Sequence, residues 1–316
     1  MKRALPILAV LLVLLAAIAL ANPVFLEPAG FLAFLKRAAP LVILAAGQYF
    51  VIVSGEFDLS VGSLVTAEVV IAARLIDGDE SATWPVLVLL IVIGLLVGLV
   101  NGVVTTKLRV PSFIVTLGML LILSGAVFLW TGGAPRGALS EGFRVFGRGG
   151  LGPVPWSVLI LLAMGAAAIW LMRADFGKTL IATGDNERAA ALSGVRVDRA
   201  KIFAFMLSGL AAAVAAILLG GFAGVSAQVG QGLEFSAITA VVLGGVALGG
   251  GRGSVLAAMA GAFTLEALFT LLNLYGISGA LEFTVQGVII IAAVAAGAIR
   301  LPRKFTPRRG DAHAAS

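Results

Sequence analysis

Acidic and hydroxyl side chains interrupt an otherwise apolar sequence at residues 55–63, which read Gly-Glu-Phe-Asp-Leu-Ser-Val-Gly-Ser. A carboxylate costs about 2.5–3.5 kcal/mol to place in hydrocarbon on insertion scales, so such acids usually face a cavity or a polar partner. Asp58 or Ser60 can cap the helix that starts here by accepting from its free N–H groups. One interpretation is a cap in a short polar loop. The other is a broken helix in which Glu56, Asp58 and Ser60 line a transport pathway.

Further polar residues stand inside long apolar runs and must find hydrogen-bond partners away from lipid. Glu68 and Glu266 lie well within such runs and are the best additional pathway candidates; the alternative is that they join one helix to another. Carboxylates and amides accept from hydroxyl groups without needing an opposite charge, so such a lining would suit a neutral polyol. The predicted pathway residues are Glu56, Asp58, Ser60, Glu68, Asn101, Glu266 and Asn273, and Gln48 and Gln286 are of the same kind.

A polar segment at 173–201 separates two apolar runs and contains Gly-Asp-Asn-Glu-Arg-Ala-Ala-Ala-Leu-Ser-Gly-Val at 184–195. Asp185 or Asn186 is a suitable N-cap, alanine and leucine favour helix, and Gly194 suits the position just past a helix end. The pattern predicts a short amphipathic helix, parallel to the membrane, in a solvated loop large enough to dock a partner. The alternative is a plain connecting helix.

The elements that must position these residues are membrane helices. Hydrophobic residues make up 60% of the 316 and charged residues 12%, against about 45–50% and 25% in soluble domains, which excludes an ordinary soluble or a disordered chain. The fold class expected is all-α, a polytopic membrane protein of about ten transmembrane helices with a broken or re-entrant segment near 55–63, in one domain over 1–300. The predicted spans, most of them near the length that crosses the bilayer, are 4–21, 37–54, 59–76, 84–106, 111–131, 155–172, 202–223, 235–248, 254–275 and 283–300, of which 235–248 is short and glycine-rich.

Lysine and arginine set the expected orientation. Most of the 22 lie in segments that share a side with residues 173–201 and with the basic tail 301–316, and cytoplasmic loops carry this excess. The chain is therefore expected in the bacterial cytoplasmic (inner) membrane with both termini inside. Residues 1–22 also fit a cleaved signal peptide ending in Ala-Leu-Ala, which would leave the later topology unchanged. The net charge of +6 follows from topology, so no nucleic-acid partner is predicted.

Several chemistries lack the residues they need. Cysteine is absent and the single histidine is His313 in the tail, so neither a metal site nor a catalytic triad is expected, and we predict no enzyme activity. Gly177-Lys178-Thr179 lacks the earlier glycine of a nucleotide-binding loop, because Met172 stands there. By contrast, glycines at 94, 98 and 102 share one helix face and predict close helix packing rather than chemistry.

Several motifs together resemble a known family, the permease subunits of ATP-binding-cassette importers for monosaccharides of the ribose, xylose and galactose type. Residues 55–63 are similar to its Gly-Gly-Ile-Asp-Leu-Ser-Val-Gly-Ser signature. Residues 110–118, Val-Pro-Ser-Phe-Ile-Val-Thr-Leu-Gly, are similar to its Ile-Pro-Pro-Phe-Ile-Val-Thr-Leu-Gly stretch. Residues 182–195 resemble its cytoplasmic loop, and 240–245 and 249–253 resemble stretches near its end. The likeness covers about residues 40–300, with Glu56 where the family usually has glycine and Asp185 where another small residue is common.

The resemblance implies the other subunits of the importer and its transport mechanism. Two permease copies, identical or different, would form the pathway. Two ATPase subunits would bind ATP and Mg, and an extracytoplasmic sugar-binding protein would deliver the cargo, while this chain itself binds no cofactor. Alternating access would move the sugar without making or breaking a bond. The helix predicted at 184–195 resembles the element that couples to the ATPase, and the residues implied are Gly184, Asp185, Asn186, Glu187, Ala190 and Gly194.

Other functions fit parts of the sequence. A branched-chain amino-acid or nucleoside permease of the same superfamily is the first alternative, although an amino acid would need a site for its carboxylate and the deepest arginines, Arg74 and Arg252, lie near span ends. A proton-driven secondary transporter with Glu68 or Glu266 as its proton site is the second. A membrane-embedded enzyme is the least favoured because histidine, cysteine and catalytic motifs are missing.

Overall fold

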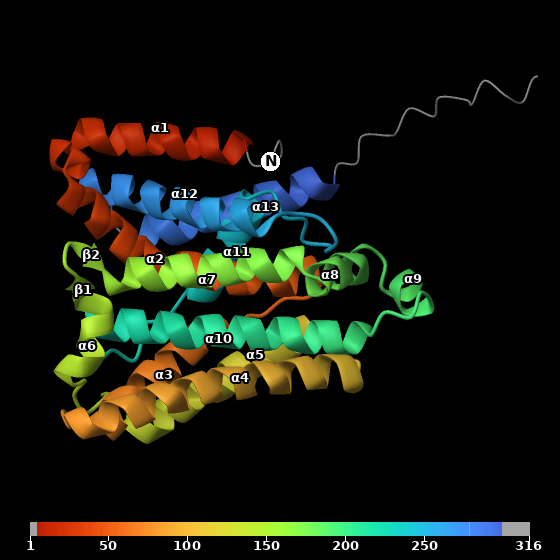
Figure 1. Ribbon diagram of the computed structural model, residues 1–316, viewed down its shortest axis with the longest axis horizontal. Coiled ribbons are helices and arrows are strands. Elements are labelled where there is room, and N and C mark those ends of the chain that lie inside the picture. Colours follow the sequence, from red (N-terminus) through yellow and green to blue (C-terminus); the bar gives the residue numbers. More distant parts are fainter. Residues whose placement is uncertain (1–4, 278, 299–316) are drawn as a thin grey trace, which may run out of the picture.

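The fold is a bundle of helices that run roughly along one common direction (Figure 1). The structure, a computed structural model, describes residues 5–277 and 279–298, so the tail 301–316 lies outside the described residues. The helices are α1 Leu5–Ala21, α2 Pro28–Val53, α3 Val61–Ile76, α4 Thr83–Lys107, α5 Ser112–Thr131, α6 Glu141–Arg148, α7 Trp156–Arg173, α8 Asp175–Asp185, α9 Glu187–Leu192, α10 Val197–Ala223, α11 Leu233–Leu243, α12 Val255–Leu274 and α13 Gly279–Ala298, with 3-10 turns at Pro23–Leu26 and Glu80–Ala82 and strands β1 Gly150–Leu151 and β2 Val154–Pro155.

The all-α prediction is confirmed, and each predicted span overlaps one helix, although α2 starts nine residues before the predicted 37 and α11 ends at Leu243 rather than 248. Among the described residues, six helices are long and apolar enough to cross a membrane, and three apolar stretches are shorter, at Leu5–Ala21, Leu233–Leu243 and Leu281–Ala292. Ten crossings therefore remain a prediction. α6 and the β1–β2 hairpin lie at one end of the bundle, and α8 and α9 lie at the other (Figure 1). The segments 132–154, which holds α6 and the hairpin, and 173–201, which holds α8 and α9, thus lie at opposite ends of the bundle, in agreement with the topology predicted from lysine and arginine.

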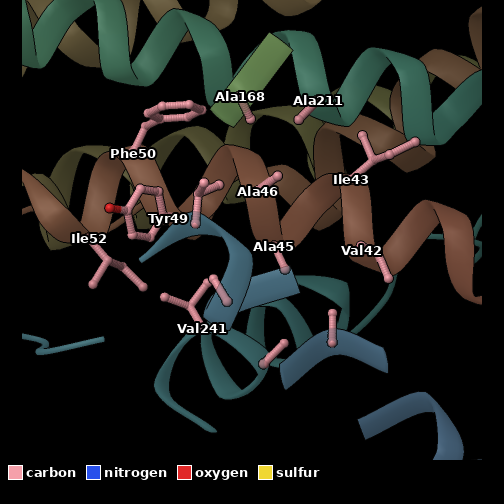
Figure 2. Packing of buried hydrophobic residues seen from close by; sticks show 14 of the residues in the cluster. Val42, Ile43, Ala45, Ala46, Tyr49, Phe50, Ile52, Ala168, Ala211 and Val241 are labelled. Carbon is pink, nitrogen blue, oxygen red and sulfur yellow. The ribbon is translucent and has the colours of Figure 1, made fainter. Parts of the chain in front are cut away.

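Helix α2 forms the centre of the largest apolar cluster. Its second half is buried on every side, as expected of a helix that is hydrophobic all round. Figure 2 shows Val42, Ala46 and Phe50 of α2 in this cluster, together with Ala168 of α7 and Val241 of α11. The central position of α2 places its C-terminal end, where the 55–63 motif begins, among several other helices.

Helices α4 and α10 approach each other through glycine. A Cβ atom at Gly94 would collide with the backbone carbonyl of Gly209, and one at Gly209 would collide with that of Gly94. Gly98 lies equally close to the backbone of Phe205. The prediction of close packing along this glycine face is confirmed, and the result is that α10 lies directly on α4 with no side chain between their backbones.

The predicted break at 55–63 is present. Helix α2 ends at Val53 and α3 begins at Val61, and Gly55 turns the chain with a φ of 90°, a conformation that glycine adopts without strain. The expected cap differs in detail: Ser60 is the N-cap residue of α3, but its side chain makes no capping bond. The Asp58 carboxylate instead accepts from the Ser60 backbone N–H, and its other oxygen accepts from Ser208 of α10.

Candidate functional site

The non-helical residues 54–60, hereafter the break, are held by a buried polar network. One Asp58 oxygen accepts from the Ser60 N–H at 3.0 Å and from the Ser60 hydroxyl at 2.6 Å. The other accepts from the Ser208 hydroxyl of α10 at 2.8 Å. Asn101 of α4 donates to the Ser60 hydroxyl at 2.9 Å. Each of these residues is at most 1% exposed, so every donor matters, since an unpaired buried polar group costs about 1–3 kcal/mol.

Two motifs that the sequence analysis separated meet at the break. The Phe57 N–H donates to the Ser112 hydroxyl at 3.1 Å, and the Thr116 hydroxyl donates to the Phe57 carbonyl at 3.4 Å. Ser112 and Thr116 belong to the 110–118 motif, at the start of α5. Hydroxyls from α5 therefore satisfy the backbone groups that the break leaves without helical partners.

The structure thus brings Asp58, Ser60 and Asn101 together, and adds Ser208. These side chains do not belong to the lining of the cavities described below. Their observed contacts fix the position of the break between α4 and α10. Sequence reasoning missed Ser208 because a single serine in an alanine- and glycine-rich helix carries no signal of its own.

A cavity of about 450 Å³, lined by both apolar and polar side chains, lies between α3, α5 and the loop that leads into α11. Ligand sites in proteins commonly span about 300–1,000 Å³. Hydroxyl, amide and carboxylate groups point toward this space, and its lining contains no lysine or arginine. We call this space the α3–α5 cavity. Its polar lining residues are Ser63, Thr66, Ser124, Thr131, Gln228, Gln231 and Glu234.

Glu234 is placed in the α3–α5 cavity by close backbone packing. A Cβ atom at Gly62 would overlap the Glu234 carboxylate and the Gly230 carbonyl, and the Gly230 N–H donates to the Thr66 hydroxyl at 3.0 Å. The segment 230–234 therefore rests directly on α3. Gln228, Gln231 and Glu234 were not predicted from the sequence; the available signal was their regular spacing of three residues between two apolar runs.

A second cavity, about 260 Å³ in volume, lies between α2, α11, α12 and α13. The Arg37 Nε donates to a Glu266 oxygen at 3.1 Å, and an Arg37 Nη donates to the Thr270 hydroxyl at 2.8 Å. Asn273 donates to the Glu282 carboxylate at 3.0 Å. Glu266 is thus paired with a permanent cation, and Asn273 joins α12 to α13.

Glu68 stands apart from both cavities. It is fully buried in α3, and neither carboxylate oxygen has a hydrogen-bond partner within the part of the chain that the structure describes. Gln48 of α2 is also fully buried, and neither its side-chain nitrogen nor its side-chain oxygen has a hydrogen-bond partner among the described residues. The predicted roles of Glu68 as a pathway residue or a proton site stay predictions.

The 184–195 segment forms the predicted short helix, α9. The Asn186 side chain accepts from the Ala189 N–H at 2.9 Å and so caps α9, and Gly194, with a φ of 83°, follows its last turn. Ala190 is buried, whereas Leu192 is 84% exposed. Gly184 packs against the backbone of Val53. The segment thus presents an apolar tip outward and contacts the end of α2 inward, and Asp185 lies exposed between these two parts.

The charges beside α9 include one exposed pair and one buried cation. Lys178 donates to Asp175 at 2.9 Å; this hydrogen bond, together with the lysine charge, lowers the pKa of Asp175, so that carboxylate stays ionised at neutral pH. Lys201 of α10 contacts two carboxylates, those of Glu56 and Glu187, each at 2.7 Å. A predicted pathway residue and a predicted coupling residue therefore share one ammonium group.

Known import permeases are similar to this chain over nearly its whole length. The ribose import permease protein of Bacillus subtilis (strain 168) is 36% identical over 90% of this chain and 89% of its own length. The galactose/methyl galactoside import permease protein of Escherichia coli (strain K12) is 34% identical over 93% and 94%. The autoinducer 2 import system permease protein of Escherichia coli O157:H7 is 34% identical over 87% and 81%. No solved structure matches the chain.

The family match covers residues 30–294 and carries the description branched-chain amino acid transport system / permease component. A permease component is a transport subunit that works with other components rather than an enzyme. The apolar helices agree with this assignment and make the chain a multi-pass protein of the inner (cytoplasmic) membrane. The chain belongs to the permease-component family of branched-chain amino acid transport systems, in which import permeases for ribose, galactose and autoinducer 2 are its relatives.

Proposed function

We propose that this chain is the transmembrane permease subunit of an ATP-binding-cassette importer for a monosaccharide. The relatives named for ribose and galactose import match about nine-tenths of the chain. The structural observation that carries the proposal is the α3–α5 cavity, where hydroxyls, amides and one carboxylate stand beside apolar side chains and no lysine or arginine is present. Such groups donate to and accept from sugar hydroxyls.

The same cavity disfavours a branched-chain amino acid as cargo, although the family description names one. The substrate carboxylate would need a cation or an exposed helix N-terminus. The α3–α5 cavity offers Glu234 instead, which repels a carboxylate, and the arginine of the second cavity is already paired with Glu266. Arg74 and Arg136 line a separate pocket of about 240 Å³ at the end of α5 and are not part of the α3–α5 cavity lining. A proton-driven mechanism would use Glu68 or Glu266; the pairing of Glu266 with Arg37 argues against Glu266 in that role.

We assign each proposed partner to one exposed surface of the chain. We assign α9 to the cytoplasm, where it docks on an ATPase subunit that binds ATP and Mg, and we place both termini on the same side. The opposite end, with α6 and the hairpin, receives the sugar-binding protein. Helix α5 exposes a large apolar surface, including Ile122, Phe128 and Leu129, and lies beside the α3–α5 cavity. A second permease copy on this surface would enclose the cavity between two subunits.

The choice of substrate class is tested by uptake. Cells of the source organism that lack this chain should lose binding-protein-dependent uptake of radiolabelled ribose or galactose and regain it when the chain is supplied. Uptake of radiolabelled leucine should not change. Loss of leucine uptake with normal sugar uptake would instead support the amino-acid alternative.

Glu234 is expected to contact the sugar. Glu234→Ala should lower uptake by about tenfold or more, because a hydrogen bond to a charged group contributes about 1.5–3 kcal/mol, whereas Glu234→Gln, which keeps an acceptor, should lose less. Initial rates of uptake in proteoliposomes with the ATPase and binding protein measure this. Glu27→Gln, which changes an exposed acid outside the cavity, is the matched control. Full uptake by Glu234→Ala at a normal unfolding temperature would exclude the role.

Leu192 is expected to insert into the ATPase. Leu192→Asp should weaken co-purification of the ATPase with the tagged chain by roughly 10- to 100-fold, since burying a leucine contributes about 1.5–3 kcal/mol. Leu151 is also a strongly exposed leucine, at the opposite end of the bundle, so Leu151→Asp should leave co-purification unchanged. Equal retention of the ATPase by both variants would contradict the docking of α9.

A further inference from the structure

Lys201 lies at the meeting point of three segments that are far apart in the sequence. Its ammonium donates to the Glu56 carboxylate in the break and to the Glu187 carboxylate in α9, at 2.7 Å in each case. Lys201 itself belongs to the first turns of α10. One side chain therefore joins α9, α10 and the break.

Burial makes this contact different from an ordinary surface ion pair. The Lys201 side chain is 7% exposed and that of Glu56 is 15% exposed, whereas Glu187 is 59% exposed. Exposed pairs are weak because water screens them, but removing one partner of an enclosed pair leaves an uncompensated charge. The Lys201–Glu56 ion pair is therefore the more strongly stabilising of the two, and the Lys201–Glu187 ion pair faces solvent at α9.

The face of α10 that carries Lys201 contacts the break a second time, through Ser208. Lys201 and Ser208 are seven residues apart, close to two helical turns, and so point in similar directions. Lys201 contacts Glu56, and Ser208 contacts Asp58 two residues further along the break. A displacement of this end of α10 thus carries both acids of the break with it.

Backbone packing supports the link from α9 to the end of α2. The Gly251 N–H donates to the Val53 carbonyl at 2.8 Å, and Gly184, just before α9, fits against both residues with no room for a Cβ atom. The start of the 184–187 segment thus packs directly on the end of α2. Lys201 links the other end of this segment, Glu187, to Glu56 in the break that follows α2.

We propose that Lys201 is a positioning residue that transmits movement of α9 to the break, through its simultaneous ion pairs with Glu187 and Glu56. The proposal rests on the proposed function, because it assigns the movement of α9 to the ATPase. Lys201 does not contact the cargo in this mechanism. Its role is to make α9 and the break move as one body, so that ATP hydrolysis is converted into rearrangement of the buried network around Asp58.

The test uses the chain reconstituted in proteoliposomes with its ATPase and sugar-binding protein, and measures sugar uptake and ATP hydrolysis together. Lys201→Gln should keep ATP hydrolysis but lower the sugar transported per ATP by roughly tenfold, within the usual range for coupling between sites. Lys201→Arg, which keeps the charge, should retain most of the coupling. Lys107→Gln is the matched control, because Lys107 pairs with Asp198 at an exposed site near the same end and should leave the ratio unchanged.

Charge-reversal variants distinguish a role of Lys201 in coupling α9 to the break from a role in the stability of the chain alone. In Glu56→Lys with Lys201→Glu, the buried pair is restored but Glu187 now faces a glutamate, so the unfolding temperature should recover while the sugar transported per ATP stays low. Adding Glu187→Lys should restore the ratio. Equal ratios for the double and triple variants, or a normal ratio in Lys201→Gln, would overturn the proposal. Failure of the proposed function would look different, because the unaltered chain itself would then show no ATP-driven sugar uptake.

Discussion

Gly98→Leu is expected to abolish folding of the chain into its bundle. A side chain at this position has no space, because the Phe205 backbone of α10 lies where the first carbon would be. Overpacking a tight contact usually costs 1–3 kcal/mol, and about 3 kcal/mol or more is expected here because the obstacle is backbone, which cannot rotate away. Gly94→Leu should behave in the same way, since it faces the Gly209 carbonyl. The measurements are the yield of monodisperse protein in detergent and its unfolding temperature.

The matched control lies in another membrane helix. Gly118 and Gly125 of α5 also stand within a helix, but nothing lies within 4 Å of a Cβ atom built on them. Gly118→Leu and Gly125→Leu should therefore leave yield and unfolding temperature close to those of the unaltered chain. A loss in all four variants would show that helical glycine is needed for another reason, such as flexibility, and not for the contact between α4 and α10.

Asp58→Ala is expected to destabilise the chain by about 3–5 kcal/mol and to stop transport. The substitution removes the acceptor of three hydrogen bonds, from the Ser60 N–H, the Ser60 hydroxyl and the Ser208 hydroxyl. All of these donors are buried, so they lose their partners without gaining water. Thermal unfolding in detergent measures the stability, and sugar uptake in proteoliposomes measures the function.

Two further variants identify the cause. Asp58→Asn keeps one acceptor oxygen for Ser60, and the Ser208 hydroxyl can turn to accept from the new amide, so a smaller loss is expected. Ser208→Ala removes one hydrogen bond to the buried carboxylate and should cost about 1.5–3 kcal/mol. An Asp58→Ala chain as stable as Asp58→Asn would contradict the idea that unsatisfied donors dominate. Normal stability with no uptake would instead place Asp58 in the pathway.

The sequence predicted most of the fold because the membrane leaves few options. Each apolar run of sufficient length becomes a helix, since every backbone polar group must be satisfied within it. Polar residues at 54–60 and proline at 111 mark ends that the structure confirms to within a few residues. The short helix α9 followed from local signals alone, a cap at Asn186 and a stop at Gly194.

The site was harder to predict, since its residues are brought together by packing. Asp58, Ser60 and Asn101 were named for being polar in an apolar context, but nothing local indicates that Ser208 completes their network. Glu56 was assigned to the pathway, and the structure shows that its partner is Lys201, which is 145 residues away in the sequence. Lys201 itself had counted only as one of several loop cations.

The sequence by itself determined the class of molecule, the ends of its helices and the face on which glycines sit, because these depend on local composition and on the cost of exposing polar groups to lipid. Only the tertiary structure decided which polar residues face a cavity and which face one another. That choice depends on how α4, α5 and α10 are rotated about the break, and rotation is set by close contacts such as Gly94 on Gly209. Such contacts join residues over a hundred positions apart, so the glycine spacing in α4 marks the packing face but does not say which helix packs on it or at what rotation.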